Sequence, residues 1–236
     1  MHRSLYRLNQ LFILAIFLFL LVVFAGCQSA SSKSVNNPST ASQGAAAMQA
    51  ILFNERGIAY AKSGQYTEAI VDFTRAIELN PKYTDAFVNR GMAYIHLKQN
   101  EQALADYTKA IELNQADAGA YFYRGTVYVS MADYDKALND FNKAISLDPK
   151  NAVAYNGRGN TYTSLREYEK AIADFSKAIE LAPDYALAYF NRGMAYKQIA
   201  NKTWAMDDFI KCKELAKDPT LVQSAKLEIE DIASRQ

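Results

Sequence analysis

The chain has 236 residues, of which 50% are hydrophobic, and its 26 basic and 25 acidic side chains give a formal net charge of +1. This composition excludes an intrinsically disordered chain and the strongly basic surface typical of nucleic-acid-binding proteins. With only two cysteines and two histidines, we expect no disulfide framework, no metal site and no cofactor.

The first 27 residues have the pattern of a secretory signal peptide. Arg3 and Arg7 stand in a start without acidic residues, and the apolar run LFILAIFLFLLVVFAG leads to Cys27. About sixteen apolar residues span roughly 24 Å as a helix, less than the ~30 Å hydrocarbon core of a bilayer. Because positive charges stay on the cytoplasmic side, the pattern predicts export of everything after Cys27.

The stretch from Phe24 to Cys27 resembles the bacterial lipobox, in which the cysteine is acylated and becomes the first mature residue. Ala25, Gly26 and Cys27 match that motif, whereas Phe24 stands where leucine is usual. The resemblance implies lipidation at Cys27, and Gln28 implies an outer-membrane location facing the periplasm. Two alternatives stay open: an uncleaved anchor in the inner membrane, and an anchor whose soluble part faces the cytoplasm.

Residues 28–47 are rich in Ser, Asn, Gly and Ala and show no hydrophobic periodicity. This composition predicts a flexible tether. Twenty such residues reach about 25 Å on average, which holds a folded domain clear of the membrane surface.

A 34-residue period organises residues 48–217. The hexamer NRGMAY occurs at 89–94 and again at 191–196, three periods later. A glycine recurs at each period, followed by a tyrosine after three residues, an alanine after twelve and an aromatic residue after sixteen. The glycines are Gly57, Gly91, Gly125, Gly159 and Gly193, and the aromatic residues are Phe73, Tyr107, Phe141, Phe175 and Phe209.

This pattern is similar to the tetratricopeptide repeat (TPR), a helix-turn-helix unit of 34 residues. The resemblance covers five copies, at about 50–83, 84–117, 118–151, 152–185 and 186–219. It implies an all-α fold, a right-handed superhelical solenoid in which each copy supplies a helix A and a helix B. The chain departs from the pattern in having Phe or Tyr where Trp is usual, and Gln115 replaces one closing proline.

The hydrophobic pattern supports the same architecture independently. Each predicted helix has one apolar stripe, and a single helical hairpin cannot bury both stripes, so the copies must stack. Residues 218–236 abandon the period. Their apolar stripe from Leu221 to Ile232, with a polar opposite face, predicts a helix that caps the last repeat.

An arginine and an aspartate sixteen residues apart occur in every copy. Antiparallel packing of helices A and B brings the two positions level, and the aspartate is also level with the arginine of the next copy. We therefore predict an Arg–Asp ladder through the stack, structural rather than anion-binding. Its members are Arg56, Asp72, Arg90, Asp106, Arg124, Asp140, Arg158, Asp174, Arg192 and Asp208.

In TPR proteins, helix A lines the concave face at its second, fifth, ninth, twelfth and thirteenth positions. Carried over, this implies a partner-binding groove of Asn54, Ile58, Val88, Met92, His96, Phe122, Thr126, Asn156, Asn160, Thr163, Phe190, Met194 and Lys197. The two asparagines of the fourth copy would hydrogen-bond an extended peptide. Phe122 and Phe190 either anchor that peptide or pack against neighbouring helices.

No phosphate-binding loop or catalytic Ser/His/Asp set is recognisable in the sequence, so an enzyme is only a remote alternative. The resemblance implies a non-catalytic, membrane-anchored scaffold that binds proteins or extended peptides in the cell envelope, and no nucleic acid. A lipoprotein that assists pilus-secretin assembly, or a periplasmic chaperone-like protein, is the alternative. Self-association also stays open.

Overall fold

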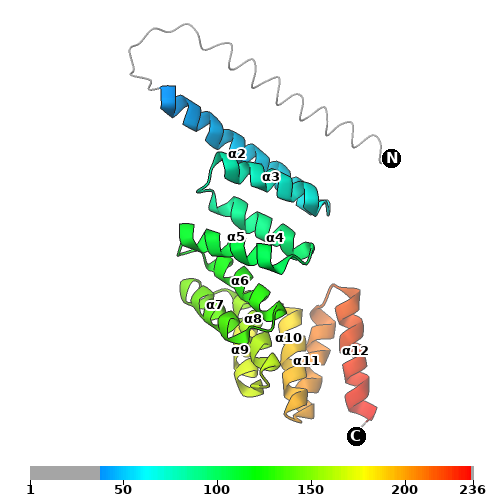
Figure 1. The fold of residues 1–236 in the computed structure, drawn as a ribbon. Helices are drawn as coiled ribbons and strands as arrows, with labels where there is room; N and C mark the ends of the chain where they lie inside the picture. Colours follow the sequence, from blue (N-terminus) through cyan, green and yellow to red (C-terminus); the bar gives the residue numbers. More distant parts are fainter. Residues whose placement is uncertain (1–37, 235–236) are drawn as a thin grey trace, which may run out of the picture. The chain divides into compact units, whose positions relative to one another are not determined.

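The computed structural model describes residues 38–234, and they are helical throughout apart from short turns (Figure 1). The first helices of the five pairs are α2 (Pro38–Lys62), α4 (Thr84–His96), α6 (Ala118–Ser130), α8 (Ala152–Ser164) and α10 (Ala186–Gln198). The second helices are α3 (Tyr66–Leu79), α5 (Asn100–Leu113), α7 (Tyr134–Leu147), α9 (Tyr168–Leu181) and α11 (Lys202–Leu215). A final helix, α12 (Pro219–Ser234), follows them. The predicted all-α repeat solenoid is confirmed.

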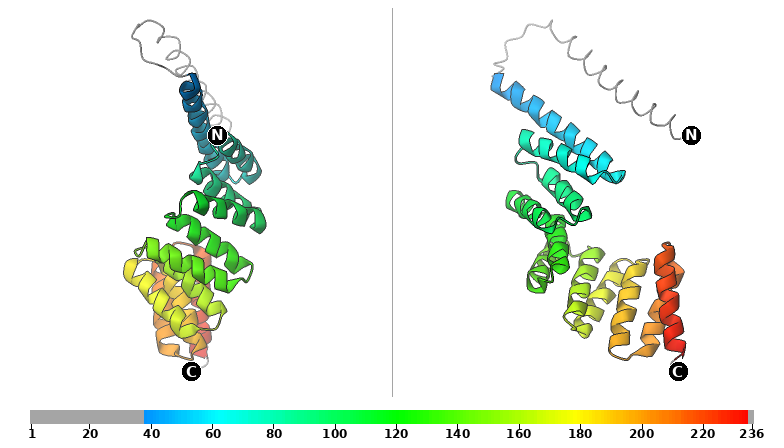
Figure 2. Two further views of the ribbon diagram at one scale, coloured as in Figure 1. Left: turned by 60° about the vertical axis from the view of Figure 1, so that its left-hand side comes forward. Right: turned by 45° about the vertical axis from the view of Figure 1, so that its right-hand side comes forward.

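The chain divides into two units, residues 1–44 and residues 45–236, and the repeats lie in the second. Within this unit each helix from α4 to α12 contacts the helix before it, and consecutive first helices from α4 to α10 also contact one another (Figure 2). The core is therefore a continuous series of small interfaces, as expected for a solenoid.

The turn inside each pair repeats one backbone geometry. Its central residue has a positive φ angle between 58° and 78°, and the next residue's N–H donates to the carbonyl of the repeated tyrosine at 2.9 Å. This hydrogen bond runs from the sixth residue of a six-residue segment back to the carbonyl of its first residue, and it ends each first helix. Glycine occupies the positive-φ position only in the first repeat; the five residues are Gly64, Lys98, Ala132, Arg166 and Ala200.

The repeated glycine lets the two helices of a pair meet. A methyl group added at Gly57 would lie 2.6 Å from the Phe73 ring, and one at Gly159 would lie 2.6 Å from the Phe175 ring. Both rings are almost completely buried. The glycine costs about 1 kcal/mol of helix propensity, and in return the ring fills the space that its missing side chain leaves.

Each arginine of the predicted ladder binds the aspartate of its own repeat through two parallel hydrogen bonds. Arg124 Nε and Nη2 donate to Asp140 at 2.7 and 2.8 Å, and the other four pairs have the same geometry. All five aspartates are buried. Hydrogen bonding to Asp140 raises the pKa of the Arg124 guanidinium, so the arginine stays charged in the folded protein.

The link between repeats differs from the predicted ladder. Among the described residues, no ion pair joins an aspartate to the next repeat's arginine. Instead the third arginine nitrogen donates to a hydroxyl or amide oxygen on the preceding second helix, as in Arg124 Nη1 to Thr108 Oγ1 at 3.2 Å. The other acceptors are Thr74, Asn142 and Ser176. The short Thr, Ser or Asn side chain reaches the guanidinium, while the aspartate accepts two hydrogen bonds from the arginine of its own repeat.

The predicted tether requires a correction. It was expected to extend to residue 47, but α2 begins at Pro38, so its last ten residues are helical. Three consecutive alanines before Met48 favour helix, and proline is well suited to a first helical turn. Cys27 and residues 28–37 lie outside the described residues. None of the described helices is both long and apolar enough to cross a membrane.

Candidate functional site

The first three repeats form two adjoining pockets on the side of their first helices, and we call these two pockets together the A-helix groove. Of the predicted groove residues, Met92 and His96 line both pockets, Ile58 lines one and Thr126 the other. Both shared side chains come from α4, which lies between α2 and α6 in the chain and contacts α6. The groove is therefore continuous across three repeats.

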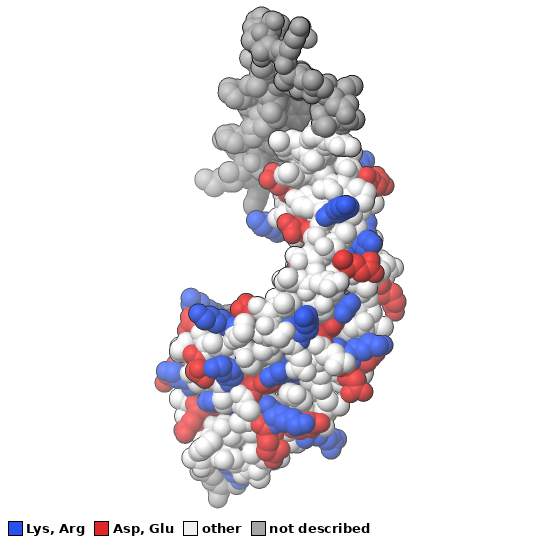
Figure 3. All heavy atoms as spheres, turned by 90° about the vertical axis from the view of Figure 1, so that its left-hand side faces the viewer, with Lys and Arg blue, Asp and Glu red and all other residues white. Residues whose placement is uncertain are grey.

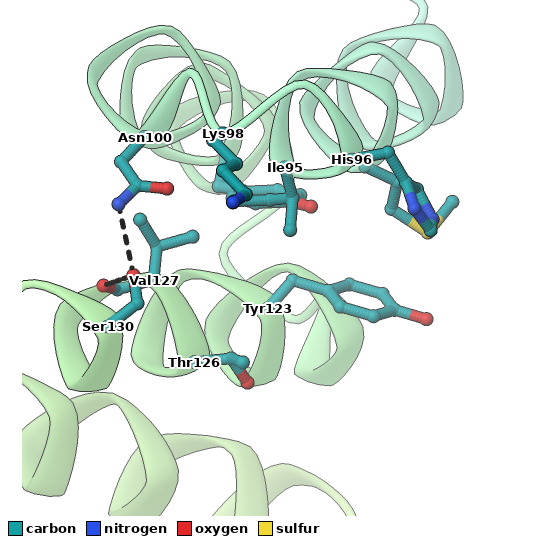
Figure 4. A pocket seen from close by; sticks show the side chains of 10 residues that line it. Ile95, His96, Lys98, Asn100, Tyr123, Thr126, Val127 and Ser130 are labelled. Carbon is teal, nitrogen blue, oxygen red and sulfur yellow. Dashed lines mark hydrogen bonds between the residues drawn. The ribbon is translucent and has the colours of Figure 1, made fainter. Parts of the chain in front are cut away.

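The larger pocket has a volume of about 500 Å³ and lies between α4 and α6 (Figure 4). Ile95 and Tyr123 point into it from the two helices, with Tyr107 and Val127 buried beneath. One edge is closed by Asn100, whose amide donates to Ser130 Oγ at 3.2 Å. The volume lies in the range of ligand pockets in proteins, and it can hold one large apolar side chain.

The smaller pocket, of about 260 Å³, lies between the first and second repeats. Here the His96 imidazole stacks on the Tyr66 ring, with centroids 4.2 Å apart and the planes 5° from parallel. His96 is nevertheless exposed, so the stack holds the ring in place while its other face stays accessible. This histidine is the wall that the two pockets of the groove share.

The groove also has an electrostatic bias. The basic side chains in its lining are Lys62, His96 and Lys98, and no aspartate or glutamate lines either pocket. On the face drawn in Figure 3, by contrast, acidic and basic side chains are interspersed without a large patch of one sign. A polyanion would meet no continuous basic surface on that face, whereas a short neutral or acidic segment is compatible with the groove.

Asn54 and Asn156 were predicted to line the groove, and the structure shows that they do not. Both side chains are 5% exposed, and each accepts a hydrogen bond at 3.0 Å from the asparagine 35 residues later, Asn89 and Asn191. These donors are the first residues of the two NRGMAY hexamers. The fifth position of a repeat therefore contacts the sixth position of the next repeat, and it is unavailable to a partner.

The same contact uses other chemistry in the middle of the stack. Val88 and Tyr123 pack against the same buried cluster of Ala103, Tyr107 and Val127. Phe122 lies over Gly157, where an added methyl group would come within 3.3 Å of its ring. Phe122 also contacts the Phe141 ring at a centroid distance of 5.8 Å. Of the two roles considered for Phe122, the structure favours packing between repeats.

The groove residues predicted in the fifth repeat are covered by the last helix. Phe190 and Met194 pack in a cluster with Ile229 and Ile232 of α12. Lys197 donates to Glu228 and lies 2.8 Å from Asp231, and these two hydrogen bonds raise its pKa. Lys197 therefore holds the cap and does not face a partner. In the fourth repeat, Asn160 is exposed and Thr163 half-buried, and neither lines the groove.

Several groove residues were missed at the level of sequence. Tyr66 belongs to a second helix, and Tyr123 stands at the sixth repeat position, outside those assigned to the concave face. Ile95 and Ser130 stand at the twelfth and thirteenth positions of their repeats, which are assigned to that face, but they were not included in the predicted groove. The available signal was local: Tyr123 is the only aromatic residue at the sixth repeat position. Among residues 38–234, no three His, Cys, Asp or Glu side chains are arranged to hold a metal ion.

Family models match the chain without a gap from residue 50 to residue 219. A tetratricopeptide repeat model matches 50–83, 84–117 and 152–185, and two others of the same description match 106–139 and 186–219. A TPR repeat model matches 125–165. The chain is a tetratricopeptide repeat protein. Proteins of this family are generally non-catalytic adaptors.

Solved TPR structures resemble the chain over most of their own length. The first TPR domain of Spaghetti (RPAP3), bound to the HSP90 peptide SRMEEVD, is 29% identical, with 50% of this chain and 94% of that chain covered and a TM-score of 0.50. A MamA structure is 25% identical, with 67% of this chain and 92% of that chain covered and a TM-score of 0.61. Pseudomonas aeruginosa PilF has a TM-score of 0.69, with 81% of this chain and 90% of that chain covered, but its 15% identity shows the fold alone. Among curated protein sequences, no relative matches.

Proposed function

We propose that this TPR protein is a membrane-tethered scaffold of the cell envelope that binds an extended peptide segment of a partner protein in the A-helix groove. The observation that carries the proposal is the pair of adjoining pockets that share Met92 and His96. An extended peptide presents alternate side chains to a surface, and separate pockets can each take one of them. The peptide bound by the similar Spaghetti domain is consistent with this role.

The lining of the groove indicates the chemistry of the peptide. Its base is apolar, with Ile58, Met92, Tyr107 and Val127, so two apolar or aromatic anchors suit it best. Lys62 and Lys98 stand at the edges of different pockets without a lining acid. A segment with acidic residues beside its apolar anchors would therefore be preferred over a basic one.

A selection from a random linear-peptide library, followed by fluorescence anisotropy, tests the groove. Thr126→Arg places a long charged side chain at an exposed position of the larger pocket, and we expect at least a tenfold loss of affinity for the selected peptides. Thr67→Arg is the matched control, because Thr67 is also exposed but lies on α3 outside both pockets. Equal binding by the two variants would exclude the groove.

The tether in this proposal is the lipidated Cys27, which holds the solenoid at the outer membrane on its periplasmic side. The signal-like leader and its lipobox resemblance support it. Metabolic labelling with radioactive palmitate should mark the wild-type chain and leave Cys27→Ser unlabelled. An alkaline-phosphatase fusion after residue 47 should be active. An active fusion without label would instead indicate the uncleaved signal anchor, and an inactive fusion would exclude export.

A further inference from the structure

A repeated contact on the surface of the third and fourth repeats holds an ammonium group. The Lys136 ammonium lies 5.4 Å from the centre of the Tyr128 ring and 2.6 Å from Asp133 Oδ2. The Lys170 ammonium lies 5.4 Å from the centre of the Tyr162 ring, with the carboxylate of the preceding turn as its partner at 2.5 Å. Each lysine is thus held between an aromatic face and a carboxylate, a favourable arrangement for a cation.

The fifth repeat keeps the aromatic ring of this arrangement, Tyr196, but has neither the lysine nor the carboxylate at the equivalent positions. Trp204 stands at the lysine position, and it packs edge-to-face with Tyr196 at a centroid distance of 5.1 Å and an angle of 88°. Asn201 replaces the carboxylate and caps α11 by accepting from the Trp204 N–H. A new carboxylate, Asp207, appears one turn beyond the tryptophan at a repeat position that holds Val, Ala, Asn and Ala in the other copies.

Trp204 and Asp207 line a cavity of about 230 Å³ on α10 and α11, together with Arg192, Tyr196 and Asp208. Trp204 is 56% exposed, so one face of the indole is accessible. Asp207 is exposed and forms no ion pair with a described residue, whereas Asp208 accepts two hydrogen bonds from Arg192. The Arg192–Asp208 pair is neutral as a unit, and Asp207 leaves the cavity with one net negative charge.

We propose that this cavity, which we call the Trp204 site, binds a substituted ammonium group from outside the chain, stacked on the indole face and paired with Asp207. Tryptophan is the aromatic residue that interacts most strongly with cations, and quaternary ammonium groups are recognised by aromatic walls of this kind. The site lies on other helices than the A-helix groove and does not depend on it. Two sources share the chemistry: a lysine side chain of a partner, and a choline-type amine.

The single tryptophan of the chain supplies a selective probe. The indole N–H signal of the ¹⁵N-labelled protein comprising residues 28–236 should shift during titration with choline chloride or with Nα-acetyl-lysine methylamide, at constant ionic strength. The neutral carbon isostere of choline, 3,3-dimethyl-1-butanol, should bind at least fivefold more weakly. The stronger of the two cationic ligands identifies the source.

Two variants decide whether the site is the one described. Asp207→Asn keeps the shape and should weaken choline binding at least threefold, whereas Asp135→Asn, at an exposed position on α7, should leave it unchanged. Trp204→Lys replaces the indole by the lysine that the third and fourth repeats have at this position and should abolish binding, measured on the choline methyl signal. No shift with either cation, equal binding of the isostere, or unchanged affinity in Asp207→Asn would each overturn the proposal.

Discussion

At the scale of single residues, the buried Arg–Asp pairs dominate the electrostatics. The two side chains of the Arg124–Asp140 pair are only 18% and 8% exposed. Isolated surface pairs contribute about 0–1 kcal/mol, but removal of one partner from a buried pair costs about 3–5 kcal/mol because a charge is left without compensation. Substitution of these aspartates is therefore expected to be costly through the loss of the pair itself.

Asp140→Ala should accordingly lower the free energy of unfolding by about 3 kcal/mol, the lower end of the range for a buried pair because Arg124 keeps some access to water. Urea denaturation followed by circular dichroism measures the change. Asp135→Ala, on the same helix but exposed, should change stability by no more than about 0.5 kcal/mol. Similar losses in the two variants would mean that the pair is not energetically special.

The buried thiol of Cys212 produces a second effect at this scale. Burial raises its pKa from the ordinary value of 9.0 to about 11. The unfolded chain therefore releases this proton at a lower pH than the folded chain, and the associated stability is complete below pH 9 and is lost as the pH rises towards 11.

Between pH 8 and pH 10.5, Cys212→Ala should consequently lose about 2 kcal/mol less stability than the wild type, because it lacks this one titrating proton. Urea midpoints at the two pH values give the difference. Because each protein is compared with itself at the two pH values, the cost of the truncation, which is the same at both, cancels. Parallel pH profiles for the two proteins would contradict the assignment.

At the scale of elements, the turns carry strain that the helices do not. Ala132 and Ala200 have φ angles of 58° and 60°, a conformation that costs a residue with a Cβ atom about 1–2 kcal/mol. The equivalent residue of the first repeat is Gly64, which adopts it at no steric cost. The strain is tolerated because the hydrogen bonds of the turn and the packing of both helices determine the backbone there.

Ala132→Gly should therefore stabilise the protein by about 0.5–1 kcal/mol, since the relieved strain exceeds the added flexibility of the unfolded chain. Ala105→Gly provides a control of opposite sign: Ala105 is exposed in the interior of α5, and the change should destabilise by about 1 kcal/mol. Thermal melts of both variants give the two signs. A loss of stability in both would refute the role assigned to the turn.

The contact between the fifth position of one repeat and the sixth position of the next determines how neighbouring first helices pack against each other. It is polar where two asparagines meet, as in Asn156 and Asn191, and apolar where the Phe122 ring lies over Gly157. Asn156→Ala would leave the Asn191 amide without its acceptor, at a cost of about 1–3 kcal/mol. A double-mutant cycle with Asn191→Ala measures the coupling, and additive effects of the two changes would mean that the pair contributes nothing specific.

At the scale of the whole molecule, the two ends of the solenoid unit differ. Helix α12 covers the last repeat with Ile232, which is 3% exposed, and with the ion pairs of Lys197. At the beginning, Leu52 on α2 is 44% exposed, at the repeat position where the other four copies have a fully buried alanine. Because each interface in a solenoid contributes almost independently, the cap acts chiefly on its own neighbours.

Ile232→Ala should lower the free energy of unfolding by about 2–4 kcal/mol, whereas Leu227→Ala on the exposed side of the same helix should change it by less than about 0.5 kcal/mol. Hydrogen exchange localises the effect: in Ile232→Ala, protection should fall in α10 to α12 and remain in α4 to α6. A uniform loss of protection would mean that the solenoid unfolds as one cooperative unit.

The sequence was sufficient to predict the period, the helix pairs, the capping helix and the pairing of each arginine with the aspartate of its own repeat. All of these depend on residues close in the chain and on a pattern seen five times. It did not determine that Asn54 and Asn156 are buried, that Lys197 binds α12, or that Tyr66 and Tyr123 belong to the groove. Only the tertiary structure decided these, because the exposure of a side chain in a stack depends on the side chain it meets one repeat away, and that partner varies from copy to copy.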